Sequence, residues 1–101
     1  MINEIETTFT FRNTEATDAL KSHALDKLDR LNKFLVKPAA AHFIFKVEGA
    51  RHVAEITLHV KGNRFVGVDT SNDMYTSIDG AVDKIRKQIS RDREKIKDHK
   101  P

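Results

Sequence analysis

The sequence predicts an α+β domain with the element order β-α-β-β-β-α, in which a four-stranded sheet carries both helices on one face and is polar on the other. Three observations predict this fold. Polar and apolar residues alternate over four short segments, apolar residues recur every three or four positions over two longer segments, and short glycine-containing links join the last three alternating segments. Each helix can bury its apolar side only against the sheet and the other helix, so one shared core is expected.

The first strand and the first helix are predicted from two different periods. Residues 5–12 alternate between apolar and polar side chains, which is the pattern of a half-buried strand. Asn13 or Thr14 is then expected to cap a helix of about 20 residues. The apolar seam of this helix consists of Leu20, Ala24, Leu28, Leu31 and Leu35. Pro38 prevents the helix from continuing.

Three further strand-like segments follow in quick succession, and three alanines, residues 39–41, are expected to form the link that leads to them. Turns around Gly49 and Gly62 are short enough for hairpins, so the three strands should form an antiparallel meander. The predicted strands are residues 43–48, 54–61 and 65–68.

The last quarter of the chain predicts a second helix, capped by Asn72 or Asp73, with two separate faces. One face is apolar and comprises Ile78, Val82, Ile85, Ile89 and Ile96. The other is basic and comprises Lys84, Lys87, Arg91 and either Arg93 or Lys95. Since an α-helix turns about 100° per residue, each set recurs on its own side. Gly80 costs helix stability, which predicts close packing against the sheet or the other helix.

Positive charge is concentrated towards the end of the chain. The net charge is +3, but residues 1–50 carry seven basic and seven acidic side chains, whereas residues 84–101 carry eight basic and three acidic ones. An outward row of cations one turn apart suits a phosphate backbone, so RNA binding is predicted. The same pattern also fits a solvated charged face that only keeps a surface helix soluble.

Composition excludes several classes of protein. The 101 residues suffice for one domain, and the absence of cysteine excludes disulfides and thiolate metal sites, which suits a reducing cytosol. No apolar stretch approaches the roughly 20 residues of a membrane span, and the first residues show no secretory signal. A cytoplasmic protein without a membrane anchor is therefore expected.

The sequence offers no catalytic group. It contains no glycine-rich phosphate loop or nucleophile motif, so we expect neither an enzyme nor a cofactor. Asp79 and Asp83 are one turn apart and could share a metal ion or a proton, but they also fit as acids beside Lys84 and Lys87. Tyr75 could stack on a base or on ribose, or it could pack at the start of the helix and help to fix that helix to the sheet. No ligand pair at helical or strand spacing emerges among His23, His42, His52, His59 and His99, so no metal site is expected.

Several short motifs carry a resemblance to a known family. The second helix contains Asp73-Met74-Tyr75, Ile78-Asp79-Gly80 and Asp83-Lys84, followed by a basic run to Lys97. Upstream, the matching segments are Leu20 to His23, Lys27 to Leu31 and Thr57 to Val60. The chain resembles the bacterial ribosome hibernation factors, the HPF, YfiA (RaiA) and S30EA-type ribosome-associated proteins, over nearly its whole length.

The resemblance implies a protein of translation regulation that acts in stress and stationary phase. It would bind the small ribosomal subunit and its ribosomal RNA in the channel for mRNA and tRNA, block translation and stabilise inactive ribosomes. In this family two parallel helices present basic residues to the RNA. The positions that match are Lys21, Lys27 and Arg30 on the first helix and Lys84, Lys87, Arg91 and Lys95 on the second. The resemblance gives Arg86 no role.

The resemblance also bears on domains and assembly. Longer family members carry a C-terminal dimerisation domain, whereas this chain stops at Pro101. We therefore expect residues 1–101 to be a single ribosome-binding domain of the short type, monomeric off the ribosome. Members of that type pair ribosomes with the help of a separate small modulation factor, which is a second expected partner.

Two other functions fit the same features. A generic double-stranded RNA-binding domain has a similar order of elements, although it reads successive minor grooves with a helix and loops. A protein-interaction module for an acidic partner would also use a basic face. Binding to intact subunits, short duplex RNA and ribosome-free lysate distinguishes the three functions.

Overall fold

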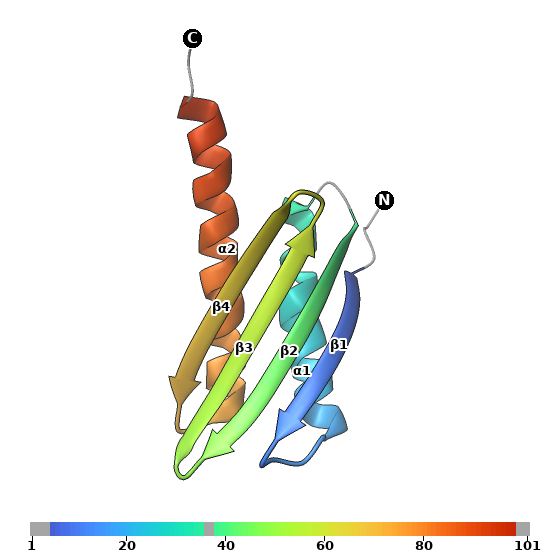
Figure 1. Cartoon of the computed structure of the whole chain (residues 1–101), viewed down its shortest axis with the longest axis vertical. Helices are drawn as coiled ribbons and strands as arrows, with labels where there is room; N and C mark the ends of the chain where they lie inside the picture. Colours follow the sequence, from blue (N-terminus) through green and yellow to red (C-terminus); the bar gives the residue numbers. More distant parts are fainter. Residues whose placement is uncertain (1–4, 36–37, 99–101) are drawn as a thin grey trace.

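The computed structural model has the predicted element order, with a short 3-10 helix added after the first helix (Figure 1). It describes residues 5–35 and 38–98, and the side chains of these residues as far as Asp92. The strands are β1 (Ile5–Arg12), β2 (Ala39–Glu48), β3 (Arg51–Val60) and β4 (Asn63–Ser71). The helices are α1 (Asp18–Asp29), η1 (Asn32–Phe34) and α2 (Met74–Asp98).

The four strands form one sheet in the order β1-β2-β3-β4. β1 and β2 are parallel, because α1 lies between them in the chain, and the other two pairs are antiparallel. The predicted meander is confirmed: Glu48 pairs with Arg51 and Val60 with Asn63, so each hairpin has a two-residue turn. Gly49 and Gly62 have φ angles of 61° and 82°, which glycine adopts at no steric cost.

Both helices cover the same face of the sheet and run roughly parallel to each other (Figure 1). The core between the layers contains the predicted apolar seams. In α1 and the segment after it the buried residues are Leu20, Ala24, Leu28, Leu31 and Leu35; in α2 they include Ile78, Val82, Ile85 and Ile89. Phe43 and Phe45 of β2 are fully buried and contact the rings of Phe9 and Phe11 on β1. Ile96 lies outside the described side chains.

The first helix is shorter than predicted. It begins at Asp18 and ends at Asp29, and its cap is Thr17, whose Oγ1 accepts a hydrogen bond from the Leu20 amide at 3.2 Å. The prediction of a cap at Asn13 or Thr14 is wrong, because Asn13 has a left-handed φ of 55° and lies in the connection from β1. A 3-10 turn after Asp29 brings Leu31 and Leu35 into the core without a continuous helix.

Residues 39–41 are not a link, as predicted, but the first part of β2. Ala39 and Ala41 are buried and pair with Ile5 and Thr7 of β1. β2 lies in the interior of the sheet, so these residues bond to a strand on each side, and this pairing outweighs the weak strand preference of alanine.

The start of α2 is fixed by two hydrogen-bonded groups. Asp73 is the cap, as one of the two predictions had it: its Oδ2 accepts bonds from the Thr76 amide at 3.3 Å and the Thr76 hydroxyl at 2.9 Å. These bonds, the Thr76 hydroxyl first, hold the pKa of Asp73 below its usual value. The buried Ser77 hydroxyl donates to the His52 carbonyl at 2.7 Å and so joins α2 to β3.

Two glycines allow α2 to lie close to β4. A Cβ on Gly80 would overlap the Asp69 carboxylate, and a Cβ on Gly67 would overlap the main-chain oxygen of Ala81. The close packing predicted for Gly80 is confirmed, and its neighbour is the sheet. Neither α1 nor α2, over its described residues, is long and apolar enough to cross a membrane.

Candidate nucleic-acid interface

The layer of two helices carries the predicted basic residues. Lys27 and Arg30 lie on α1, on the side that faces α2, while Lys21 lies beside β1 with its Nζ 6.0 Å from the centre of the Phe11 ring. Lys84, Lys87 and Arg91 are exposed on α2. Lys95 and the alternative Arg93 lie outside the described side chains.

A groove of about 180 Å³ separates the two helices. Its charged lining combines three cations from both helices with two carboxylates. Lys27 and Arg30 come from the α1 side and Arg86 from α2, and the remaining lining residues are Leu31, Asp79, Val82 and Asp83. The groove therefore brings together two predicted cations and one that the sequence analysis left without a role.

Asp79 joins the two helices at one end of the groove. Its Oδ1 lies 2.6 Å from His23 Nε2 and 3.6 Å from Lys27 Nζ, both on α1. The expectation that Asp79 fits beside Lys84 and Lys87 is wrong, because it faces α1 instead. Tyr75 is partly exposed and packs edge to face on His23 with 5.0 Å between ring centres. It therefore packs at the start of the helix, as one prediction had it, but this contact is with α1 rather than with the sheet.

Asp83 organises two cations on α2 itself. Its Oδ1 accepts a hydrogen bond from Arg86 Nε at 3.0 Å, and its Oδ2 lies 3.2 Å from Lys87 Nζ. The Arg86 and then the Lys87 hydrogen bonds hold the pKa of Asp83 below its usual value, so the carboxylate is ionised at neutral pH. The predicted pairing of Asp83 with a lysine of α2 is confirmed for Lys87.

Lys84 lies on the opposite flank of α2 from Arg86. Two residues correspond to about 200° around a helix, so their side chains point to different sides. Lys84 Nζ donates to the Val68 carbonyl of β4 at 2.5 Å and lies 3.6 Å from Asp69, and the Gln88 amide donates to the Val66 carbonyl at 2.6 Å. Lys84 and Gln88 thus cover the outer edge of β4, which would otherwise expose strand carbonyls.

The predicted cations therefore differ in how free they are to bind a partner. Lys27, Lys84 and Lys87 each contact a carboxylate. Arg30 and Arg91 are exposed and make no ion pair with any residue that the structure describes. Since a free guanidinium gives up no existing bond when it meets a phosphate, Arg30 and Arg91 are the cations best prepared for one.

Neither the position of Arg86 in the groove nor the contact of His23 with Asp79 was predicted from the sequence. The signal for Arg86 was present, since Asp79, Asp83 and Arg86 recur at helical spacing on one flank of α2. No comparable signal existed for the pair of His23 and Asp79, because 56 positions separate them in the chain.

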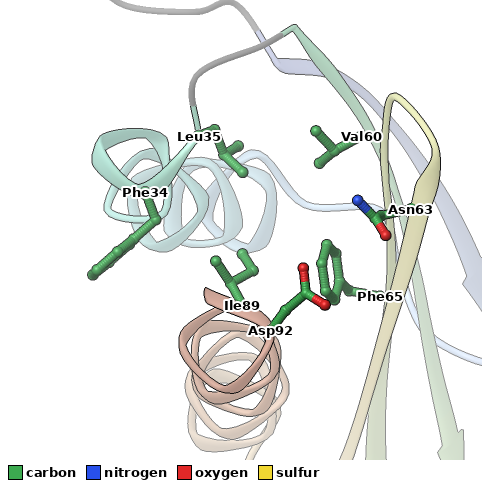
Figure 2. A pocket seen from close by; sticks show the side chains of 7 residues that line it. All are labelled: Phe34, Leu35, Val60, Asn63, Phe65, Ile89 and Asp92. Carbon is green, nitrogen blue, oxygen red and sulfur yellow. The ribbon is translucent and has the colours of Figure 1, made fainter. Parts of the chain in front are cut away.

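A second hollow, of about 330 Å³, lies between η1, the β3–β4 hairpin and α2 (Figure 2). Leu35, Ile89 and Phe65 make its walls apolar, and Asp92 is the charged residue of its lining. This hollow does not suit a polyanion. Among the side chains that the structure describes, no three of His, Asp or Glu are grouped so that they could hold a metal ion.

Comparison with known proteins supports the resemblance seen in the sequence. Residues 7–97 match the family described as "Sigma 54 modulation protein / S30EA ribosomal protein". The chain belongs to this family. Similar members are named ribosome hibernation promoting factor: that of Salmonella typhimurium is 33% identical over 90 residues, covering 89% of this chain and 95% of the relative. That of Escherichia coli K12 is 32% identical over the same shares of the two chains.

Solved structures show the same fold. The N-terminal domain of Protein Y from Thermus thermophilus superimposes with a TM-score of 0.80 at 29% identity, over 92% of this chain and 100% of that one. A ribosomal subunit interface protein from Coxiella burnetii has a TM-score of 0.77 at 20% identity, over 88% and 98% of the two chains, and supports the fold alone. Ribosome hibernation promoting factors are ribosome-binding proteins rather than enzymes, so the family confirms the expectation of a non-enzymatic protein.

Proposed function

We propose that this protein is a ribosome hibernation factor that binds the small ribosomal subunit in the channel for mRNA and tRNA. It contacts the ribosomal RNA through the cations of α1 and α2 and keeps idle ribosomes inactive and protected in stress and stationary phase. Such a factor works in the cytoplasm, where ribosomes are. The names and the sequence identity of its relatives support the hibernation role.

The observation that carries the proposal is the pair of parallel helices with exposed cations on both. Arg30 at the end of α1 and Lys87 and Arg91 on α2 are exposed, and both helices cover the same face of the sheet (Figure 1). RNA that meets this layer can contact both helices at once, which raises affinity through several phosphate contacts. The RNA-binding set we propose is Lys21, Lys27, Arg30, Lys84, Lys87, Arg91 and Lys95.

Lys84 has a weaker place in this set than Arg30, Lys87 and Arg91. Its Nζ contacts the Val68 carbonyl and Asp69, so binding RNA would require it to leave the edge of β4 or to serve both partners. We propose that Arg30, Lys87 and Arg91 carry most of the affinity.

We further propose that one copy of this domain occupies one subunit, as a monomer off the ribosome. Pairing of ribosomes then requires a separate modulation factor. Sedimentation of the free protein at micromolar concentration tests the first point: a monomer agrees with it and a stable dimer contradicts it.

One binding experiment tests the proposed function against the other two candidates. Labelled protein is titrated with purified small subunits, with a short RNA duplex, and with lysate from which ribosomes have been removed. A hibernation factor should bind the subunits far more tightly than the duplex at the same salt concentration. Equal affinity for subunits and duplex would indicate a generic RNA reader. Capture only from the ribosome-free lysate would indicate a protein partner.

A further inference from the structure

The groove between α1 and α2 has a planar cation on each side. Arg30 is the C-cap residue that follows Asp29 at the end of α1, and Arg86 lies on the flank of α2 that faces it. Both residues line the same groove. Between them, Leu31 and Val82 form an apolar floor, and both are buried. The hollow is therefore narrow, charged at its rim and apolar at its base.

Arg86 is held in place before any partner arrives. Its Nε and Nη2 atoms both lie 3.0 Å from Asp83 Oδ1, so one edge of the guanidinium is fixed and its flat face is left available. A planar guanidinium stacks on aromatic rings, and nucleobases that are unstacked from an RNA helix are often bound in this way. The bond to Asp83 reduces the loss of side-chain freedom on binding.

The charges in the hollow distinguish a base from a phosphate. Asp79 and Asp83 both line it. These two carboxylates offset two of the three cations in the lining, which weakens the attraction for a phosphate, whereas a nucleobase is neutral and its amino groups donate hydrogen bonds to carboxylate oxygens. Asp79 uses Oδ1 for both His23 and Lys27, so Oδ2 remains as an acceptor within the described part of the molecule.

The size agrees with a single flat group. Pockets for drug-sized ligands measure roughly 300 to 1,000 Å³, and this hollow measures about 180 Å³. We propose that the groove holds one unstacked nucleobase of the ribosomal RNA between the guanidinium groups of Arg30 and Arg86. The inference rests on the proposed function, because it names a nucleotide subsite within that RNA contact.

Substitution by lysine tests stacking separately from charge. Arg86→Lys keeps the positive charge but removes the flat face, and Arg86→Gln removes both. Binding to purified small subunits is measured across a range of salt concentrations. We expect Arg86→Lys to weaken binding roughly 3- to 30-fold, the range of a stacked cation, while the slope of affinity against salt stays that of the parent. Arg30→Lys should behave in the same way.

Arg64→Lys is the matched control, because Arg64 is exposed on β4 and pairs in register with the exposed His59 rather than with either helix. It should bind as the parent does. Thermal unfolding of every variant verifies the fold, which should be retained because Arg86 is exposed. If Arg86→Gln binds subunits more weakly and Arg86→Lys binds as the parent does, the contact depends on charge alone. That result would overturn the base subsite. Parental binding in both variants would also overturn it.

Chemical probing of the bases gives a second, independent result. The parent protein should change the reactivity of an unpaired base in the subunit RNA, and Arg86→Lys should no longer do so although it still binds at higher concentration. An identical base pattern for the two proteins would contradict the subsite while leaving the proposed function intact. Failure of the parent to bind subunits at all would instead contradict the proposed function.

Discussion

Acidic side chains in the helix layer determine where its cations lie. Asp79 contacts His23 and Lys27 across the two helices, and Asp83 contacts Arg86 and Lys87 one turn further along α2 itself. Paired surface ions contribute little to stability, so their main effect here is to orient side chains that RNA would contact. Arg91, which makes no such pair within the described residues, keeps its freedom.

Asp83→Asn tests the orienting role through its dependence on pH. The Arg86 and Lys87 hydrogen bonds hold the pKa of Asp83 in the folded state below its ordinary value. An aspartate whose pKa is lowered on folding stabilises the folded state when the pH is above its pKa in the unfolded chain. This contribution is lost as the pH falls through the lower pKa of the folded state. At pH 7 the variant should lose less than about 1 kcal/mol of unfolding free energy, because the pair is largely exposed.

Denaturant unfolding of parent and variant between pH 7 and pH 3 measures this difference. The difference in unfolding free energy between the parent and Asp83→Asn should become smaller once the pH falls below the pKa of an aspartate in the unfolded chain. A difference in unfolding free energy that stays constant from pH 7 to pH 3 would show that Asp83 acts through packing rather than charge.

A charge reversal on α2 tests the binding face. Lys87 and Arg91 are exposed and lie away from the apolar side of the helix. Changing both to Glu should abolish binding to small subunits and leave the melting temperature within a few degrees, since surface changes cost roughly 0.5 kcal/mol or less each. Sedimentation with subunits and calorimetry measure the two effects.

Two further variants make this result interpretable. A double variant with Arg64→Glu and Lys46→Glu changes the net charge by the same amount as the α2 double variant, but on the strands. Its binding to small subunits should stay much closer to that of the parent. Ile85→Ala should do the reverse of the α2 double variant and lower stability by about 2 to 5 kcal/mol, because Ile85 is fully buried. An α2 double variant that unfolds, or that binds like the parent, would show that the two faces of α2 are wrongly assigned.

At the scale of elements, the contact between α2 and β4 fixes the position of the basic helix. The main chain of α2 passes directly over Gly67, and Lys84 and Gln88 then reach the carbonyls at the edge of β4. The position of the exposed flank of α2 therefore depends on Gly67, because a side chain at that position of β4 would push the helix away from the sheet.

Gly67→Ala should displace α2 and destabilise the fold by about 1 to 3 kcal/mol, because the new Cβ would overlap the main chain at Ala81, which cannot rotate away. Gly80→Ala is the matched comparison. Its Cβ would meet the Asp69 side chain, which can turn aside, and alanine favours a helix by about 1 kcal/mol. Denaturant unfolding should therefore show a much larger loss for Gly67→Ala. Equal stability of the two variants would contradict the close main-chain contact.

The order of elements and the core could be predicted from the sequence because they depend on local period. Alternation in β1 and the seam of Ile78, Val82 and Ile85 are visible within a few residues. The start of α1 could not be predicted, since Thr14 and Thr17 are equally good caps and the path from β1 decides between them. Ala39 and Ala41 became strand only through pairing on both sides.

For the interface, too, the sequence predicted which residues of α2 are exposed but not which residues they contact. Helical spacing placed Lys84, Lys87 and Arg91 on one side of α2, and all three are exposed. Spacing cannot show which of them meets β4, nor that Arg86 faces Arg30 across a groove, because those contacts depend on how the two helices are placed on the sheet.

At the scale of the whole molecule, the distribution of charge matters more than its sum. A net charge of +3 is modest, yet the last 18 positions alone carry eight basic and three acidic side chains. If roughly four to six phosphates are neutralised, affinity should fall steeply with salt, with a slope on a double logarithmic plot of about −0.7 to −0.9 per contact. Titrations of small subunits at several monovalent salt concentrations and fixed Mg²⁺ measure the slope. A flat dependence would contradict phosphate contact.

In the proposed function, the whole domain acts by occupying the channel for mRNA and tRNA. Inhibition of translation should then be stoichiometric with ribosomes and reversible, and should consume no nucleotide. Two ligands that require the same path exclude each other, and thermodynamic linkage makes that antagonism reciprocal.

A pelleting competition tests this central claim most directly. Labelled protein is bound to small subunits at fixed salt, and mRNA with initiator tRNA is added in rising amounts before sedimentation. We predict that the protein leaves the pellet as mRNA and tRNA enter it, and that subunits loaded first with mRNA and tRNA resist the protein. Simultaneous binding of all three, with the affinity for the protein unchanged, would place its binding site elsewhere on the ribosome and contradict the account.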